Sequence, residues 1–139
     1  MWTVEEGIDV LKESGAKITA QRIAVLEQLV GRTDHPSADT LYRELLEKYP
    51  TMSVATLYST VQRLSEAGLL KILSIDDKRV YFDPVTVSHG HFMCRKCGRL
   101  IDVPLSREVF HLTADASAIA HIERTEVFMY GVCRDCFDD

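Results

Sequence analysis

Apolar residues in the first half of the chain recur at the three- and four-residue spacing of helices. Four such segments are present, and they predict helices over residues 3–14, 20–30, 38–48 and 54–67. Hydroxyl residues that cap helix N-termini stand at the start of three of them, and glycine or proline ends three. These signals are Thr3, Thr19 and Ser53 at the starts, and Gly15, Pro50 and Gly68 at the ends.

The fourth predicted helix has two contrasting faces. Four apolar residues are expected to face inward and five polar residues outward: Val54, Leu57, Val61 and Leu64 against Thr56, Ser59, Thr60, Gln62 and Arg63. Such an outer face suits the major groove of DNA, where bulk and negative charge are penalised.

Two β-prone runs, 69–75 and 79–82, then predict a hairpin. Helices followed by a hairpin favour a winged-helix domain; the alternative is a small helical domain with an edge hairpin.

The second half has the pattern of a small α+β domain. It predicts strands over 91–93, 100–103 and 122–132, and a helix over about 105–121. A linker over residues 83–88 begins at an Asp-Pro pair, so we expect one domain over 1–82 and another over 89–139. The exposed apolar edge that the last strand suggests would pair with a second copy of the chain, and the homodimer would carry two recognition helices.

The composition is that of a globular protein, and we expect a cytoplasmic one. The 139 residues are 46% hydrophobic, with no apolar run long enough to cross a membrane and no basic-then-apolar leader. The formal charge of −5 argues against general affinity for nucleic acid, because basic domains are its usual footprint. Any DNA contact must therefore come from a local cluster, such as Lys71, Lys78 and Arg79 of the predicted hairpin.

All four cysteines occur in two Cys-x2-Cys pairs, Cys94 with Cys97 and Cys133 with Cys136. A two-residue spacer lets one turn present both sulfurs to a zinc ion at about 2.3 Å, and two such pairs complete a closed tetrahedral site. A closed site leaves no position for a substrate, so its role is structural. The alternatives are two disulfides or four buried thiols, and a cytoplasmic location counts against disulfides.

Two histidines and a carboxylate flank the first cysteine pair. His89 and His91 are two residues apart, so both imidazoles point the same way in an extended strand. Nitrogen and oxygen donors of this kind suit iron(II), manganese or zinc. We therefore expect a second metal at His89, His91 and Asp102, with further ligands from elsewhere; the alternative is that the histidines are ordinary surface residues.

Four motifs occur in the order HPSAD, SVATLYSTVQRLSEAGLL, HGHFMCRKCG and YGVCRDC. In this order and spacing they resemble the ferric uptake regulator family of metal-dependent repressors over essentially the whole chain. The resemblance implies an N-terminal winged helix, a C-terminal dimerisation domain, a structural Zn²⁺ on the four cysteines, and a regulatory metal site between the domains.

Within that family the chain is most similar to the peroxide-responsive branch. The regulatory ligands of that branch fall on His35, Asp83, His89, His91 and Asp102, with aspartate where iron sensors more often have glutamate. The resemblance implies that bound Fe²⁺ or Mn²⁺ holds the dimer in its DNA-binding form, and that peroxide releases DNA by oxidising His35 or His89. The alternative is an iron- or zinc-responsive repressor of metal uptake genes.

Four residues are expected to contact a palindromic operator in double-stranded DNA: Lys17, Arg22, Tyr58 and Arg63. Arg22 lies in the first turn of a helix, where the dipole favours acid, so it is either a phosphate contact or a solvated arginine. The recognition tyrosine of the family falls on Tyr58. Ser59 follows it where relatives often have Arg or Asn, which is a departure from the family pattern.

An enzymatic role is not expected. The sequence offers no nucleophile with a partnered base and no glycine-rich substrate loop, so neither catalytic residues nor a small-molecule substrate are predicted. A purely structural zinc module would leave the other metal-ligand candidates unused.

Overall fold

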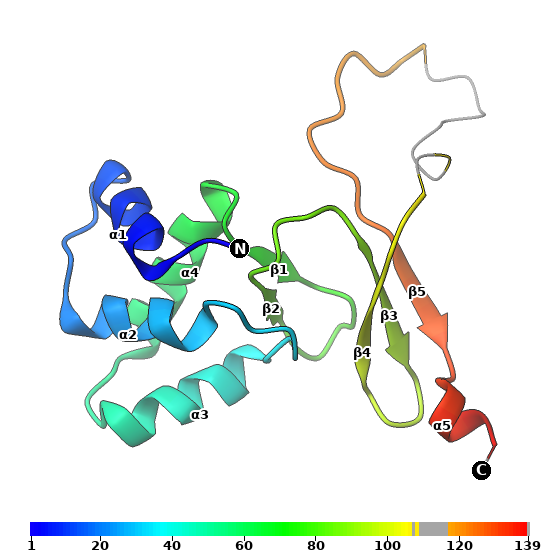
Figure 1. The fold of residues 1–139 in the computed structure, drawn as a ribbon, viewed down its shortest axis with the longest axis horizontal. Coiled ribbons are helices and arrows are strands. Elements are labelled where there is room, and N and C mark those ends of the chain that lie inside the picture. The colour runs from blue at the N-terminus through cyan, green and yellow to red at the C-terminus, as the bar shows by residue number, and fades with distance from the viewer. Residues whose placement is uncertain (107, 109–116, 139) are drawn as a thin grey trace. The chain divides into compact units, whose positions relative to one another are not determined.

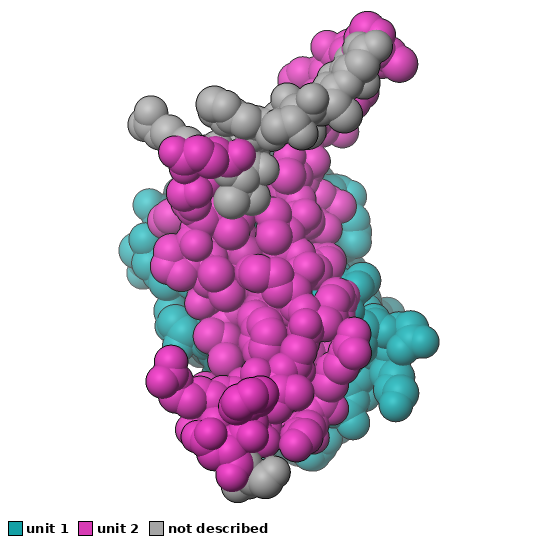
Figure 2. Space-filling model, turned by 90° about the vertical axis from the view of Figure 1, so that its right-hand side faces the viewer, with its two compact units in different colours: residues 1–86 teal, residues 87–139 magenta. Residues whose placement is uncertain are grey.

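The computed structural model describes residues 1–106, 108 and 117–138, and the chain divides into two compact units (Figure 1, Figure 2). Unit 1 is Met1–Thr86 and unit 2 is Val87–Asp139. The division falls inside the predicted linker 83–88, although Asp83 itself ends a strand of unit 1 and is fully buried.

Unit 1 begins with the four predicted helices. All three predicted N-caps are present, and Thr3 forms the full capping box with Glu6. Ser37 caps the third helix by accepting from the backbone N–H of Thr40. The helices are α1 Val4–Glu13, α2 Ala20–Leu29, α3 Ala38–Lys48 and α4 Val54–Glu66.

The core of unit 1 lies where α2 packs against the other three helices. Seven leucines of these helices become wholly inaccessible there, one from α1 and two from each of the others: Leu11, Leu26, Leu29, Leu41, Leu45, Leu57 and Leu64. Burying such a side chain contributes about 1.5–3 kcal/mol, so these contacts account for much of the stability of the unit.

A hairpin of two short strands, β1 Lys71–Leu73 and β2 Tyr81–Asp83, closes unit 1 and confirms the predicted hairpin. Both strands are shorter than the β-prone runs that predicted them. The chain just before α3 pairs with β2. The N–H of Phe82 donates to the carbonyl of Pro36 at 2.9 Å, and Ser37 forms an isolated antiparallel β-bridge with Tyr81. Four helices with this small sheet form a winged-helix unit.

Two predictions for α4 were wrong. Thr60, expected on the outer face, is fully buried and donates its hydroxyl to the carbonyl of Thr56 at 2.8 Å. That local hydrogen bond satisfies the hydroxyl, so the threonine can join the core. Val54, expected inside, is 47% exposed because it is the first residue of the helix and lies beyond the packed turns.

Unit 2 contains a three-stranded sheet in the order β4-β3-β5. The strands are β3 Gly90–Cys94, β4 Leu100–Val103 and β5 Phe128–Gly131, and a short helix α5 Arg134–Phe137 follows. β3 pairs antiparallel with β4 and parallel with β5. The α+β class predicted for the chain is confirmed.

The segment between β4 and β5 differs from the prediction where it is described. Most of the helix expected over 105–121 lies outside the described residues, and 117–121 form a turn and a bend. The strand expected over 122–132 is confined to β5. In the described part of the chain, no helix combines the length and apolarity needed to cross a membrane.

The burial of Thr60 is testable against Gln62, an exposed residue of the same helix. Thr60→Lys should lower the free energy of unfolding by about 3 kcal/mol or more, because the substitution brings an unpaired charge into the core. Gln62→Lys should change it by about 0.5 kcal/mol or less. Urea denaturation measures both, and equal effects would return Thr60 to the outer face.

Candidate metal sites and nucleic-acid interface

The four cysteines of unit 2 form one cluster. Strand pairing builds it, because Cys94 ends β3 opposite Gly131 of β5, and Cys133 lies two residues beyond. The turn after Cys94 is closed by the N–H of Gly98 donating to the carbonyl of Cys94 at 2.9 Å, and Gly98 has the positive φ of 75° that this turn requires.

The cluster has the dimensions of a zinc site. All four cysteines are free thiols, and their sulfur atoms lie within 4.8 Å of one another. The sulfurs of Cys97 and Cys133 are 3.8 Å apart, which is too long for a disulfide and matches the edge, about 3.8 Å, of a tetrahedron with zinc–sulfur bonds of about 2.3 Å. The disulfide alternative is therefore excluded in this structure.

The electrostatics of the cluster favour a bound cation. Backbone N–H groups of Cys97 and Cys133 lower the pKa of the Cys94 thiol to about 6. The hydrogen bond with Cys133 raises the pKa of the Cys136 thiol to about 12. Negative charge on several sulfurs in one place is unfavourable without a compensating cation, and zinc would supply that compensation.

Three nitrogen and oxygen donors meet in a second cluster of unit 2. His91 lies directly opposite Asp102 in the β3–β4 ladder, and His89 is two residues before His91. The Nε2 atoms of the histidines are 3.1 Å apart, and the Oδ1 atom of Asp102 lies 3.2 Å from His89 and 3.5 Å from His91. Adjacent ligands around a divalent ion with bonds of about 2.1 Å are separated by about 3 Å. Two imidazoles and a carboxylate can therefore hold one side of such an ion.

The tautomer of His89 suits metal binding. Its Nδ1 lies 2.6 Å from the carbonyl oxygen of Val87, which can only accept, so Nδ1 carries the proton. The lone pair of the neutral ring is then on Nε2, the atom that points at His91 and Asp102.

Unit 1 contains two further candidate ligands, His35 and Asp83. The Nε2 of His35 is 3.5 Å from the Oδ2 of Asp83, and both side chains are almost completely buried. The other carboxylate oxygen of Asp83 accepts from the backbone N–H of Val85 at 2.9 Å. A buried imidazole beside a buried carboxylate is a costly arrangement unless the pair is charged and matched or binds a cation.

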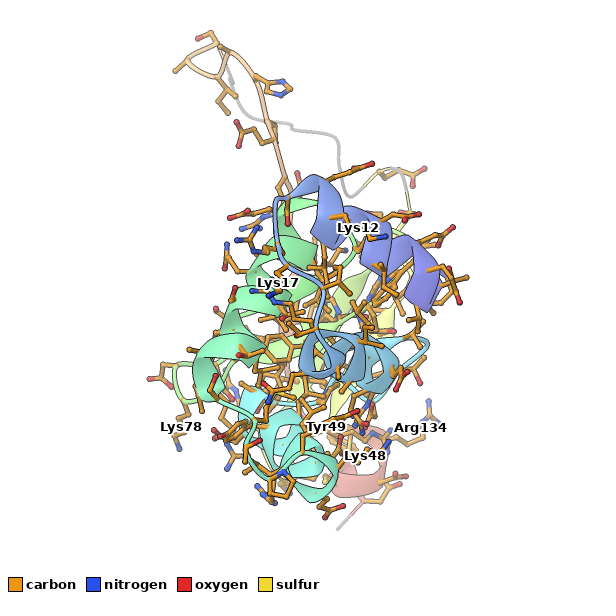
Figure 3. All side chains as sticks on the ribbon, turned by 90° about the vertical axis from the view of Figure 1, so that its left-hand side faces the viewer. Lys12, Lys17, Lys48, Tyr49, Lys78 and Arg134 are labelled. Carbon is orange, nitrogen blue, oxygen red and sulfur yellow. The ribbon has the colours of Figure 1, made fainter. Side chains whose placement is uncertain are left out.

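The predicted DNA contacts lie in different environments. Lys17 is exposed just before α2 (Figure 3). Tyr58 is 46% exposed on α4. Arg22 reaches across from α2 to α4, with its Nη2 at 3.4 Å from the hydroxyl of Ser59.

The guanidinium of Arg63 donates to the carbonyl and hydroxyl of Ser14, the C-cap of α1, at 2.7 and 2.9 Å. Arg63 thus stabilises a helix end, and contact with DNA would require it to leave these partners.

The turn of the hairpin is organised by a residue that the sequence analysis missed. Asp76 accepts from the backbone N–H groups of Lys78 and Arg79 at 3.0 and 2.8 Å and from the hydroxyl of Tyr81 at 3.2 Å. These bonds hold the pKa of the Asp76 carboxyl below its usual range, and the bond from the Arg79 N–H has the largest effect. An Asp two residues before a basic turn is the sequence signal that could have identified it.

A winged-helix unit, a four-cysteine knuckle and clusters of histidine and aspartate together define a DNA-binding metalloregulator. The profile of the ferric uptake regulator family matches residues 13–130. The chain therefore belongs to the ferric uptake regulator family, and it is a metal-dependent transcriptional repressor.

The chain is similar over nearly its whole length to several known peroxide regulators. The peroxide operon regulator of Bacillus subtilis is 40% identical over 135 residues, covering 96% of this chain and 92% of that protein. The peroxide-responsive repressor PerR of Staphylococcus aureus is 36% identical over 141 residues, with 97% and 92% covered.

Solved structures give the same fold. The ferric uptake regulator of Helicobacter pylori superposes with a TM-score of 0.77 over 99% of this chain and 96% of that one, and at 19% identity it supports the fold alone. PerR from Streptococcus pyogenes, described as a peroxide sensor and gene regulator, has a TM-score of 0.54 and 31% identity, covering 98% and 94%.

Removal of one sulfur should abolish tight zinc binding. Cys133→Ser should reduce the zinc content from about one per chain to near zero and unfold unit 2, because the energy of zinc binding is folding energy. Arg99→Ala is the matched control, since it removes only an exposed ion pair between Arg99 and Asp135 beside the cluster. Elemental analysis after dialysis reads out zinc, and zinc retained in Cys133→Ser would contradict the four-sulfur site.

Proposed function

We propose that the chain is a peroxide-responsive repressor that binds palindromic operator DNA as a homodimer in the cytoplasm. Its regulatory ion is Fe²⁺ or Mn²⁺, and the structural ion on the four cysteines is Zn²⁺. The observation that carries the proposal is the division of the ligand candidates: two buried donors belong to unit 1 and three clustered donors to unit 2.

The regulatory ligands in this proposal are His35, Asp83, His89, His91 and Asp102. Three imidazoles and two carboxylates form a harder donor set than four thiolates, so the set favours iron(II) or manganese(II) and leaves zinc to the sulfurs. Neither unit alone supplies all five donors. Metal binding by the full set therefore couples the two units, and the same coupling makes metal affinity and DNA affinity depend on each other reciprocally.

Release by peroxide rests on the ligands themselves. His35 and His89 are the rings expected to be oxidised: peroxide would transfer one oxygen atom to the ring and leave as water. Iron(II) held by these residues would promote this transfer through redox chemistry that manganese(II) supports poorly. The oxidised ring is a poorer nitrogen donor. With that donor weakened, the five ligands bind the ion less tightly and the DNA-binding form is no longer favoured. The peroxide regulators among the similar proteins support this choice.

The DNA-binding face in this proposal is formed by α2, α4 and the hairpin. The first turn of α2 contains no acidic residue, and its backbone N–H groups can bind a phosphate together with Lys17 and Arg22. Tyr58 is exposed for contact with a base or the backbone. Lys78 and Arg79 at the hairpin turn add positive charge, which offsets the acidic balance of the whole chain.

Dimerisation is assigned to unit 2. Tyr130 of β5, an edge strand of the sheet, is 47% exposed, and Val132, just beyond it, is 39% exposed. A second copy of the chain would cover them and would set two recognition helices at the spacing of two operator half-sites.

Metal-dependent DNA binding tests the repressor assignment. Manganese(II) should strengthen binding of the purified protein to a palindromic operator, and His91→Ala should abolish that effect while zinc stays at about one per chain. A mobility-shift assay with and without manganese measures the first, and elemental analysis the second. His121→Ala, a histidine outside both clusters, is the matched control. Binding that ignores manganese would refute the proposal, and zinc loss in His91→Ala would mean that the two metal sites are one.

A peroxide pulse tests the choice of inducer. In the iron(II)-loaded protein, a brief pulse should add one oxygen atom to His35 or His89 and release DNA, because these rings lie at the proposed ion. The manganese(II)-loaded protein should keep both rings unmodified and remain bound. Peptide mass spectrometry locates the oxygen. Unmodified histidines in the iron form would favour the iron- or zinc-responsive alternative.

A further inference from the structure

The loop between α2 and α3 presents His35 in a strained conformation. His35 has φ of 51°, and it is the only residue other than glycine with positive φ in the described ranges. The left-handed region is unfavourable for a residue with a Cβ atom, although histidine enters it more readily than most. Such a conformation persists only where the surroundings impose it.

Both ends of the loop are held by backbone hydrogen bonds. At the start, Gly31 turns the chain with φ of 74°, and the N–H of Arg32 donates to the carbonyl of Leu29 at 3.1 Å. At the end, Pro36 accepts from Phe82 and the N–H of Ala38 donates to the carbonyl of Val80, both at 2.9 Å. These bonds constrain the two ends, whereas Asp34 and His35 lie between them.

The side chain of Arg32 joins the middle of the loop to α3. Its Nε and Nη2 atoms donate to the two oxygens of Asp34 at 2.8 and 2.7 Å, a bidentate contact. Its Nη1 donates to Glu44 of α3 at 2.5 Å, and Glu44 also accepts from Gln28 of α2 at 3.0 Å. The guanidinium therefore links the loop to α3 directly beside His35, and Glu44 extends this link to α2 through Gln28.

We propose that Arg32 is a positioning residue for the regulatory metal: its fork on Asp34 and Glu44 holds the backbone of His35 in the left-handed conformation that points the imidazole at Asp83. This inference rests on the proposed function, because it takes His35 as a ligand.

The chemistry of arginine suits this role. The side chain of Arg32 is only 18% exposed, so its ion pairs are screened less than those of a free surface residue. A planar guanidinium can engage two carboxylates in fixed directions, whereas the ammonium of lysine is a point charge without a fork. Partners that orient a metal ligand typically change metal affinity about 10- to 100-fold when they are removed.

The test is a double-mutant cycle between Arg32 and His35, read as Mn²⁺ affinity from the electron paramagnetic resonance signal of the free ion. Arg32→Ala should weaken Mn²⁺ binding about 10- to 100-fold with zinc content unchanged, and Arg32→Lys should recover only part of the loss. In a His35→Ala background, Arg32→Ala should have no further effect, because Arg32 acts through that ring. Arg43→Ala, an exposed arginine of α3, is the matched control and should leave the affinity unchanged.

The outcomes separate this inference from the proposed function. If His35→Ala leaves Mn²⁺ affinity unchanged, the five-ligand site itself is wrong. If His35→Ala weakens binding and Arg32→Ala does not, the positioning role of Arg32 is wrong. Equal losses from Arg32→Ala with and without His35 would assign Arg32 to the general stability of unit 1, which also overturns the inference.

Discussion

Both donor clusters of unit 2 depend on the register of one central strand, β3. Its pairing with β5 brings Cys94 beside Cys133, and its pairing with β4 sets His91 opposite Asp102. Side chains alternate between the faces of a strand, so a slip of one residue would move His91 to the other face and destroy both clusters at once. A zinc ion at one end of β3 therefore also protects the geometry at the other end.

The need for a metal follows from how little apolar surface unit 2 buries. In the described ranges the large hydrophobic core belongs entirely to unit 1, whereas the buried apolar residues of unit 2 are Met93 and two of the cysteines. A unit of this size with so small a core is not expected to fold by hydrophobic burial alone. Zinc binding to four thiolates supplies roughly 10 kcal/mol or more in small metal domains, enough to compensate.

Local signals in the sequence predicted the elements, and pair spacing predicted the cysteine cluster. Caps, apolar spacing and breakers act within a few residues, so they located all four helices of unit 1 and the hairpin. The engagement of Arg63 by Ser14 was missed because it spans 49 positions, and no local pattern encodes such a contact. Thr60 was misassigned for a different reason: a polar residue is expected outside, but its hydroxyl is satisfied by the carbonyl of Thr56 within the same helix, so it can enter the core. The grouping of donors within unit 2 was predictable because strand alternation brings His89 and His91 together.

The cysteine thiolates and the imidazole and carboxylate donors are suited to different roles, one structural and the other responsive to metal supply. Thiolates bind zinc tightly and leave no open position, so the cysteine site is suited to holding structure. Imidazoles and carboxylates bind divalent ions more weakly and are divided between two units, so occupancy can follow the supply of metal. The strained backbone of His35 would suit its proposed role as a ligand: a residue held by contacts around it, rather than by its own preference, can be lost from a site through a small change in those contacts. In the proposed function, responsiveness thus derives from the weaker donors, whereas the stability of unit 2 derives from the stronger ones.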